Sequence, residues 1–142
     1  MYNRPGTLTR LSNRLMMAMA SLGLGPTKMV TLEVRGRKSG RPRSTVVNVV
    51  AVDGQRYLVA PRGETEWARN ARAAGEATLR RRGRRQVRLV EVPVEQRAPI
   101  IQAYLKENAM VTKAQFGIEP GASIEEFQRI APLHPVFRIV DQ

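Results

Sequence analysis

The sequence predicts an α+β domain built on a small antiparallel β-barrel, and three observations lead to that prediction. Six short segments show the apolar–polar alternation or the β-branched content that is typical of strands. Tight-turn residues such as Asp53-Gly54 join neighbouring segments, which favours antiparallel hairpins. Helical segments fall between the hairpins and at the ends of the chain, an arrangement that fits an antiparallel barrel with helices around it.

The strands are expected in the following order. Residues 29–35 are predicted as a half-buried strand, because three apolar residues at 30, 32 and 34 alternate with three polar residues at 31, 33 and 35. Residues 44–52 are nearly all β-branched, which predicts a strand buried on both faces. The other strands are predicted at residues 56–60, 77–82, 86–94 and 136–140.

Helices are predicted in four places. Leu and Met recur at three- and four-residue steps over residues 7–24, which predicts an amphipathic helix. Such a helix packs on the barrel, covers a ligand or lies on a membrane surface, and packing is the commonest of these. Thr65 is placed to cap a helix that ends at Gly75. The remaining helices are expected at residues 95–108, with Pro99 in the first turn, and at 123–130.

The composition limits the possible functions. The 142 residues fit a single domain over residues 1–142, and 42% hydrophobic residues are enough for one core. The 24 Lys and Arg residues exceed the 12 Asp and Glu residues by twelve, which gives a net charge of +12. Because such an excess destabilises a folded chain by self-repulsion, it predicts an anionic partner: nucleic acid, a membrane surface or a polyanionic small molecule.

Several kinds of site are not expected. The absence of Cys rules out disulfides, thiolate catalysis and Cys-ligated metals, and it fits a cytoplasmic location. The single histidine, His134, has no carboxylate cluster near it in the sequence, so we expect no metal site and a structural rather than catalytic role. The sequence contains no run of ~18 consecutive apolar residues, so no membrane span is predicted.

The best-marked motif is Gly-Arg-Lys-Ser-Gly-Arg-Pro-Arg at residues 36–43, between the first two strands. Its two glycines let the backbone approach a ligand closely, and its four cations and one hydroxyl supply donors for a phosphate. The spacing is not that of a P-loop. The alternative is a solvated hairpin tip, and composition alone does not decide between the two.

A second candidate cluster spans Pro61 to Asn70. Trp67, the only Trp, is expected in the first turn of a helix, where backbone amides and the helix dipole favour anions. A core position is the commoner role of a lone Trp. Arg62 comes directly after a strand and is harder to explain by packing.

Five arginines crowd the predicted turn at Gly83, which would suit the phosphates of nucleic acid. No aromatic residue is interleaved to stack on bases, and no known nucleic-acid-binding module is present. We therefore expect a solvated hairpin tip and no specific nucleic-acid partner. The five residues are Arg80, Arg81, Arg82, Arg84 and Arg85.

The motif at residues 36–43, the following β-branched strand with Asp53-Gly54, and Trp67-x-x-Asn70 together resemble the deazaflavin-dependent nitroreductase family. The resemblance covers about residues 29–94, and residues 134–138 are similar to the C-terminal strand of some members. It implies a split β-barrel of about six antiparallel strands with peripheral helices. It also implies an oxidoreductase that uses the reduced deazaflavin coenzyme F-420, rather than FMN, to reduce a quinone, enone, nitro compound or unsaturated lipid.

The resemblance also implies a coenzyme site. The family's phosphate-binding cations match Lys38 and Arg43, its basic residue after the next strand matches Arg62, and its coenzyme-proximal Trp matches Trp67. Asn48 stands roughly where the family has a tyrosine. No residue is identified as catalytic. The predicted cofactor-binding set is Arg37, Lys38, Ser39, Arg43, Asn48, Arg62 and Trp67.

The charge agrees with this coenzyme, because its phosphodiester and poly-glutamate tail form a polyanion that a basic protein attracts. The departures at Asn48 and at Pro61, where the family has a serine, make coenzyme binding better supported than nitroreduction. One alternative is a non-catalytic protein on the same fold that binds a fatty acid, lipid, flavin or tetrapyrrole, and a less favoured one is a nucleic-acid-binding module. We expect a monomer or homodimer, with peripheral membrane contact through residues 7–24 left open.

Overall fold

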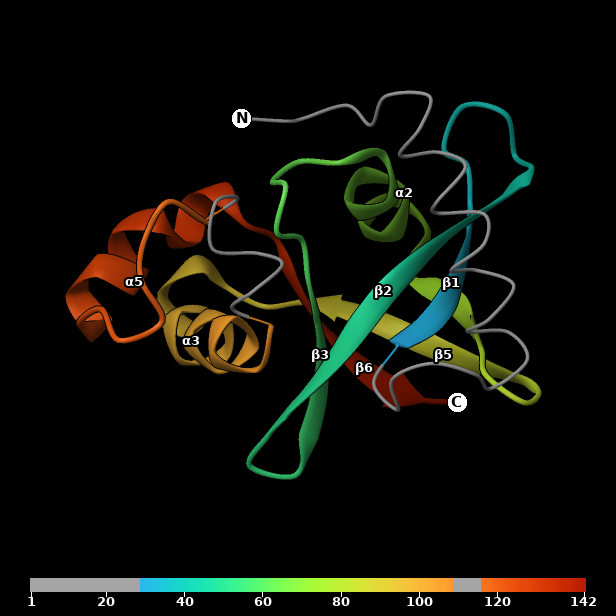
Figure 1. Cartoon of the computed structure of the whole chain (residues 1–142). Coiled ribbons are helices and arrows are strands. Elements are labelled where there is room, and N and C mark those ends of the chain that lie inside the picture. The colour runs from blue at the N-terminus through green and yellow to red at the C-terminus, as the bar shows by residue number, and fades with distance from the viewer. Residues whose placement is uncertain (1–28, 109–115) are drawn as a thin grey trace, which may run out of the picture.

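Six antiparallel strands close into a barrel in the order β1-β2-β3-β6-β5-β4. The computed structural model describes residues 29–108 and 116–142, so the predicted helix at 7–24 lies outside the described residues (Figure 1). Each predicted strand is confirmed to within a few residues at its ends. The strands are β1 Met29–Arg35, β2 Pro42–Val52, β3 Gln55–Val59, β4 Glu76–Arg80, β5 Arg84–Glu91 and β6 Val136–Asp141.

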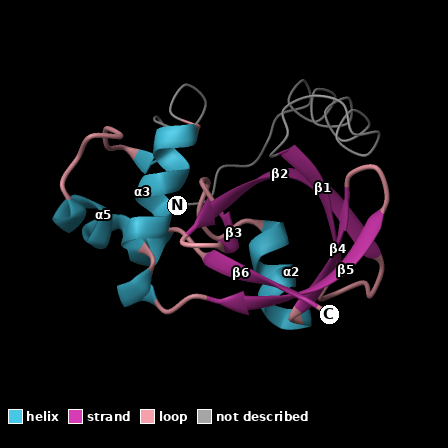
Figure 2. Ribbon diagram, turned by 90° about the horizontal axis from the view of Figure 1, so that it is seen from below, coloured by secondary structure: helices cyan, strands magenta, loops and turns pink. Residues whose placement is uncertain are grey.

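The helices occupy two places around the barrel (Figure 2). The first, α2 (Glu66–Ala74), lies across one end of the barrel and packs against β1, β4 and β5. The other two, α3 (Ala98–Glu107) and α5 (Ile124–Ile130), pack together beside the barrel, where α3 contacts β2 and β3. Short 3-10 turns, η1 (Val94–Gln96) and η2 (Ala131–Leu133), come before α3 and after α5.

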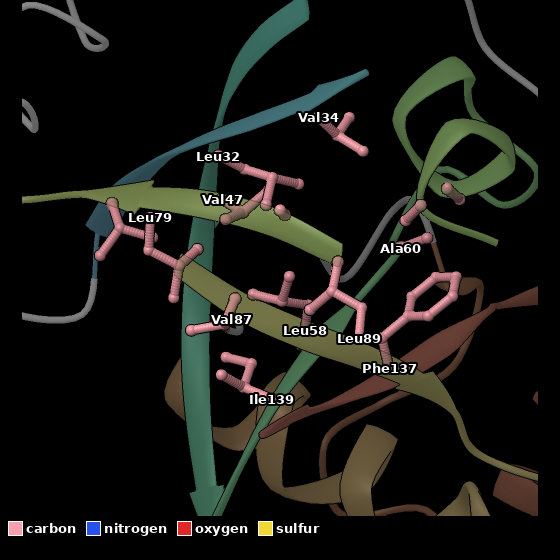
Figure 3. Packing of buried hydrophobic residues seen from close by; sticks show 14 residues of the cluster. Leu32, Val34, Val47, Leu58, Ala60, Leu79, Val87, Leu89, Phe137 and Ile139 are labelled. Atoms are coloured by element: carbon pink, nitrogen blue, oxygen red, sulfur yellow. The ribbon is translucent and has the colours of Figure 1, made fainter. Parts of the chain in front are cut away.

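The interior of the barrel is filled by the inward-facing residues of the alternating strands (Figure 3). Leu32, Leu58, Val87 and Phe137 are fully buried there. Each such side chain contributes roughly 1.5–3 kcal/mol by leaving water. A second apolar cluster joins α3 and α5 to the outer face of the barrel, and it includes Val50.

Strand β2 departs from its prediction. Only Val47 and Val50 are buried in it, and Pro42 to Ser44 are exposed. The strand pairs with β1 up to Asn48 but with β3 only from Val49 onward, and α3 covers its outer face near Val50. Within the described residues, Val47 packs in the barrel interior and Val50 packs against the helices, while the residues of β2 before Val47 are exposed or half-buried. The prediction that residues 44–52 are buried on both faces is wrong.

The ends of α2 match the sequence signals in part. Gly75 ends the helix in the left-handed conformation, with φ of 71°, as a glycine at this position predicts. Thr65 occupies the N-cap position, but its side chain makes no capping hydrogen bond to the helix. The prediction of a helix over 95–108 is also confirmed only in part, because η1 and Arg97 precede the first residue of α3, with Pro99 in its first turn.

Candidate functional site

The β1–β2 turn is wound closely on itself. The Gly36 N–H donates to the Arg41 carbonyl at 2.8 Å, and the Gly40 N–H donates to the Gly36 carbonyl at 2.9 Å. A Cβ on Gly36 would lie 2.8 Å from the Ser39 Oγ and 3.2 Å from the Arg41 oxygen, so only glycine fits there without a shift. Gly40 has φ of 72°, which also favours glycine.

Arg37 attaches this turn to the N-terminal half of α2. Its backbone N–H and its Nη1 both donate to the Asn70 Oδ1, at 3.0 and 2.8 Å, and Nη1 also lies 2.8 Å from the Glu66 Oε2. The Arg37 hydrogen bond lowers the pKa of Glu66, and the positive charge of Lys38 acts in the same direction. Arg37 is one of the predicted ligand contacts, and in the structure its side chain joins the turn to Glu66 and Asn70 of α2.

Three of the predicted residues are exposed on this turn or directly after it. Lys38 and Ser39 are at its tip, and Arg43 is the second residue of β2. The Ser39 Oγ accepts a hydrogen bond from the Arg41 N–H at 3.2 Å. An ammonium, a hydroxyl and a guanidinium on one rigid turn are donors suited to a phosphate.

Arg62 and Trp67 come from the segment that joins β3 to α2. Arg62 is half-buried and lies in a turn closed by a hydrogen bond from the Gly63 N–H to the Ala60 carbonyl at 3.1 Å. Trp67 lies in the first turn of α2 and is also half-buried, with its ring centroid 5.9 Å from that of Phe137. Trp67 thus packs on the barrel core while part of its surface is accessible to a ligand.

Asn48 lies apart from these residues. Side chains alternate along a strand, so Asn48 faces the opposite side of β2 from Arg43. Its Nδ2 donates to the Asn108 Oδ1 at 3.2 Å, at the end of α3. The neighbouring Tyr104 is buried, and burial raises the pKa of Tyr104 to about 12, against the effect of a hydrogen bond from Asn48. The structure therefore places Asn48 with α3 and not with the cations of the turn.

A hollow of about 630 Å³ lies between the β1–β2 turn, the C-terminal end of α2 and the start of β4. Its volume is in the range of small-molecule sites. Of the predicted cofactor-binding residues, Arg37 alone lines it. The lining residues are Glu33, Val34, Arg35, Gly36, Arg37, Gly40, Pro42, Ala73, Ala74, Glu76, Ala77, Thr78 and Gln86.

An ion-pair chain that sequence analysis missed joins the segment before α2 to the helical side of the molecule. Arg72 of α2 donates to the Glu64 Oε1 and the Glu91 Oε1, both at 2.8 Å. Glu91 in turn lies 3.2 Å from the buried Arg97 Nη2. These hydrogen bonds lower the pKa of Glu91 and raise that of Arg72. No local pattern marks these residues, because the partners belong to different elements and the fold brings them together.

His134 is buried beside the start of the same segment, with its Nδ1 3.0 Å from the Ala60 carbonyl oxygen. Burial lowers the pKa of His134 below its usual value of 6.5, and the Ala60 hydrogen bond opposes this only in part. Since a carbonyl oxygen can only accept, the neutral ring carries its proton on Nδ1. The structural role expected for His134 agrees with this position.

Lowering the pH should therefore destabilise the protein through His134. Because its pKa is lower in the folded state, the unfolded state takes up the proton first, and stability falls as the pH drops through 6.5 toward the folded-state pKa. The His134→Asn variant keeps an N–H donor and has no proton to gain there. We expect the free energy of unfolding of the wild type, measured by urea titration, to fall relative to this variant below about pH 6.5. Parallel pH dependences in the two proteins would contradict this assignment.

The arginine-rich β4–β5 hairpin makes contacts of its own. Arg84 lies 2.8 Å and Arg80 3.8 Å from the Glu33 carboxylate of β1. Arg81 donates to the Met29 carbonyl at 2.7 Å. Three of the five arginines thus interact with β1, which favours a hairpin held against the barrel over a row of cations open to nucleic acid.

Neither a metal centre nor a membrane span is found in the described part of the chain. Over residues 29–108 and 116–142, no three His, Asp or Glu side chains gather in a way that could hold a metal ion. Over the same ranges, no helix has both the length and the apolar character needed to cross a bilayer.

Solved structures with the same fold include three that show its range. Protein Atu2129 from Agrobacterium tumefaciens str. C58, of unknown function, has a TM-score of 0.60 and 17% identity over 98% of this chain, which spans 60% of that protein's length. A structure named F420-H2 dependent reductase (FDR-A) has a TM-score of 0.52 and 18% identity over 79% of this chain and 93% of that one. A Clostridium acetobutylicum protein of the pyridoxinephosphate oxidase family has a TM-score of 0.53 and 10% identity, over 80% and 75% of the two chains.

At these identities the likeness shows the fold, and it confirms the predicted split β-barrel with peripheral helices. No protein of curated function matches the sequence. Residues 10–121 match the family described as F420H(2)-dependent quinone reductase, and that match covers most of the chain. It confirms the enzyme class and the coenzyme that the sequence resemblance implied. The chain belongs to the F420H(2)-dependent quinone reductase family.

Proposed function

We propose that this protein catalyses hydride transfer from reduced coenzyme F-420 to a quinone, with the β1–β2 turn as the main phosphate-binding element. The observation that carries the proposal is the exposure of Lys38, Ser39 and Arg43 on a turn that Arg37 fixes to α2. A loosely held cationic tip would lose much of its binding energy in ordering its side chains. A turn already tied to a helix loses less.

The donor chemistry of the site fits the coenzyme. Lys38, Ser39 and Arg43 would hold the phosphodiester, and Arg62, in the turn after β3, would supply a further cation to the coenzyme. Trp67, half-buried on the same helix as the partners of Arg37, offers an aromatic surface to the deazaflavin ring. Asn48 contacts the ligand only if the ligand extends around β2, so we expect its contribution to be smaller than that of the turn.

In this proposal the protein binds the coenzyme and orients it toward the quinone. None of the predicted site residues is assigned as a general acid or base. When bound, the reduced coenzyme supplies a hydride; the quinone that accepts it gains two electrons and takes its second proton from solvent to become a hydroquinone. The turn would hold the anionic end of the ligand, and Trp67 would shield the deazaflavin ring from water on the side that it contacts. Residues 37–43 therefore control binding, while the position of the ring relative to the acceptor controls the rate.

The experiment is an anaerobic assay with reduced coenzyme and a water-soluble quinone. The appearance of oxidised coenzyme is measured by its absorbance. We expect its rate of formation to be proportional to protein concentration and faster with the quinone than with a nitroaromatic acceptor. The same mixture without protein gives the background rate. Tight coenzyme binding without quinone-dependent oxidation would favour the non-catalytic ligand-binding alternative instead.

A further inference from the structure

Arg62 lies in a four-residue β-turn, Ala60 to Gly63, directly after β3. The Gly63 N–H donates to the Ala60 carbonyl at 3.1 Å, and this bond joins the first and fourth residues of the turn. Pro61 occupies the second position, where its fixed φ favours a turn of type I or II. Arg62 is the third residue, so its backbone direction is set by the bonds around Ala60.

The His134-Pro135 pair holds Ala60 from the other side. The His134 Nδ1–H donates to the Ala60 carbonyl, with 3.0 Å between nitrogen and oxygen. The Pro135 carbonyl accepts from the Ala60 N–H at 2.9 Å. His134 and Pro135 therefore bind both backbone polar groups of Ala60. The Ala60 oxygen accepts two hydrogen bonds, one from the His134 imidazole and one from the Gly63 N–H that closes the turn.

His134 is itself firmly placed. Its residue is 5% exposed, and its ring centroid lies 4.4 Å from that of Phe116. Its carbonyl lies 3.4 Å from the Nη1 of buried Arg97, which also donates to the Ala131 carbonyl at 3.2 Å. A buried imidazole fixed at its ring face and its backbone gives the turn a rigid support.

We propose that His134 is a positioning residue, which holds the Ala60–Gly63 turn so that the Arg62 guanidinium meets the coenzyme phosphate. The proposal rests on the proposed coenzyme site. His134 does not reach the ligand, because it is buried and its Nδ1 is occupied by Ala60. Without this donor the Gly63 bond still closes the turn, but the turn loses a constraint. Arg62 then has to be ordered when the ligand binds, which costs affinity.

The first test compares coenzyme dissociation constants, measured by fluorescence titration of the full chain. His134→Leu removes the donor, and we expect the dissociation constant to rise about three- to tenfold. His134→Asn keeps an N–H at the position of Nδ1 and should stay within about twofold of the wild type. His134→Met, whose flexible side chain fills irregular space, replaces the Leu variant if circular dichroism shows that the latter is unfolded.

Phe116→Leu is the matched structural control. It perturbs the same apolar cluster and the face of the His134 ring, but it leaves the Nδ1–Ala60 hydrogen bond in place. We expect Phe116→Leu to lower stability without raising the dissociation constant. An equal rise in both variants would mean that His134 acts only through general stability.

The decisive arm is a double-mutant cycle with Arg62→Ala. If His134 acts through Arg62, His134→Leu has no further effect on coenzyme binding in the Arg62→Ala background. It also has no effect on a deazaflavin that lacks the phosphate and the glutamate tail. A persisting effect in either case would overturn the positioning role.

The measurements distinguish a failure of the Arg62 contact from a failure of the positioning role of His134. If Arg62→Ala leaves the dissociation constant unchanged, the proposed coenzyme contact of Arg62 is wrong, and the inference falls with it. If Arg62→Ala weakens binding but His134→Leu binds like the wild type, the contact stands and the positioning role of His134 is wrong.

Discussion

Replacing Lys38 or Arg43 with alanine is expected to weaken binding of coenzyme F-420 about ten- to a hundredfold, because each change removes a charge-assisted contact worth ~1.5–3 kcal/mol. Both side chains are exposed, so neither change opens a cavity in the core, and the fold should persist. Fluorescence titration gives the affinity, and circular dichroism checks the fold.

Arg129→Ala is the matched control for charge. Arg129 is an exposed cation in the last turn of α5, on the helical side of the barrel. Its removal lowers the net charge by the same amount but should change coenzyme affinity less than about twofold, since only long-range attraction is reduced. Equal losses in the Lys38, Arg43 and Arg129 variants would mean that the turn acts only through the overall charge.

The second large effect is on stability: Arg97→Met should lower the free energy of unfolding by roughly 3–5 kcal/mol. Arg97 is buried, and its Nε donates to the Val92 carbonyl at 2.8 Å. It also pairs with Glu91 and donates to carbonyls of the segment after α5. Burial lowers the pKa of Arg97 and Glu91 opposes this, but the group stays charged at neutral pH. Removing it takes the Arg97 donor away from the Val92 and His134 carbonyls, and urea unfolding measures the loss.

Arg56→Ala provides the comparison for that measurement. Arg56 pairs with Asp141 at 2.9 Å, but the two side chains are 36% and 63% exposed. Exposed pairs of this kind contribute about 0–1 kcal/mol. If Arg97→Met lowers the free energy of unfolding no more than Arg56→Ala does, the buried network stabilises the protein no more than an exposed ion pair.

The strands of the barrel could be predicted from the sequence because their signals are local. The alternation in residues 29–35 predicts β1 with its observed bounds, and Asp53-Gly54 predicts the β2–β3 hairpin. Burial of β2 could not be predicted in the same way. It depends on which stretch of its outer face α3 covers, and that is not encoded within the strand itself.

The candidate site shows the same division. The chemistry of the 36–43 motif is visible in its residue types, and Arg62 and Trp67 also stand out in the sequence, although only the resemblance implies their contact with the coenzyme. What the sequence does not reveal is how these residues are held. Arg37 is tied to Asn70 across 33 residues, and His134 to Ala60 across 74 residues. Contacts at such separations follow from the closed barrel and leave no local pattern.

The most direct test of the account is a fluorescence titration of the wild-type protein with coenzyme F-420 at low and at high salt. We predict saturable binding with a dissociation constant on the order of micromolar or lower at low salt. We also predict weaker binding as salt is added, because much of the attraction is between exposed charges. Absence of saturable binding at low salt would contradict the claim that the β1–β2 turn holds the phosphate of this coenzyme.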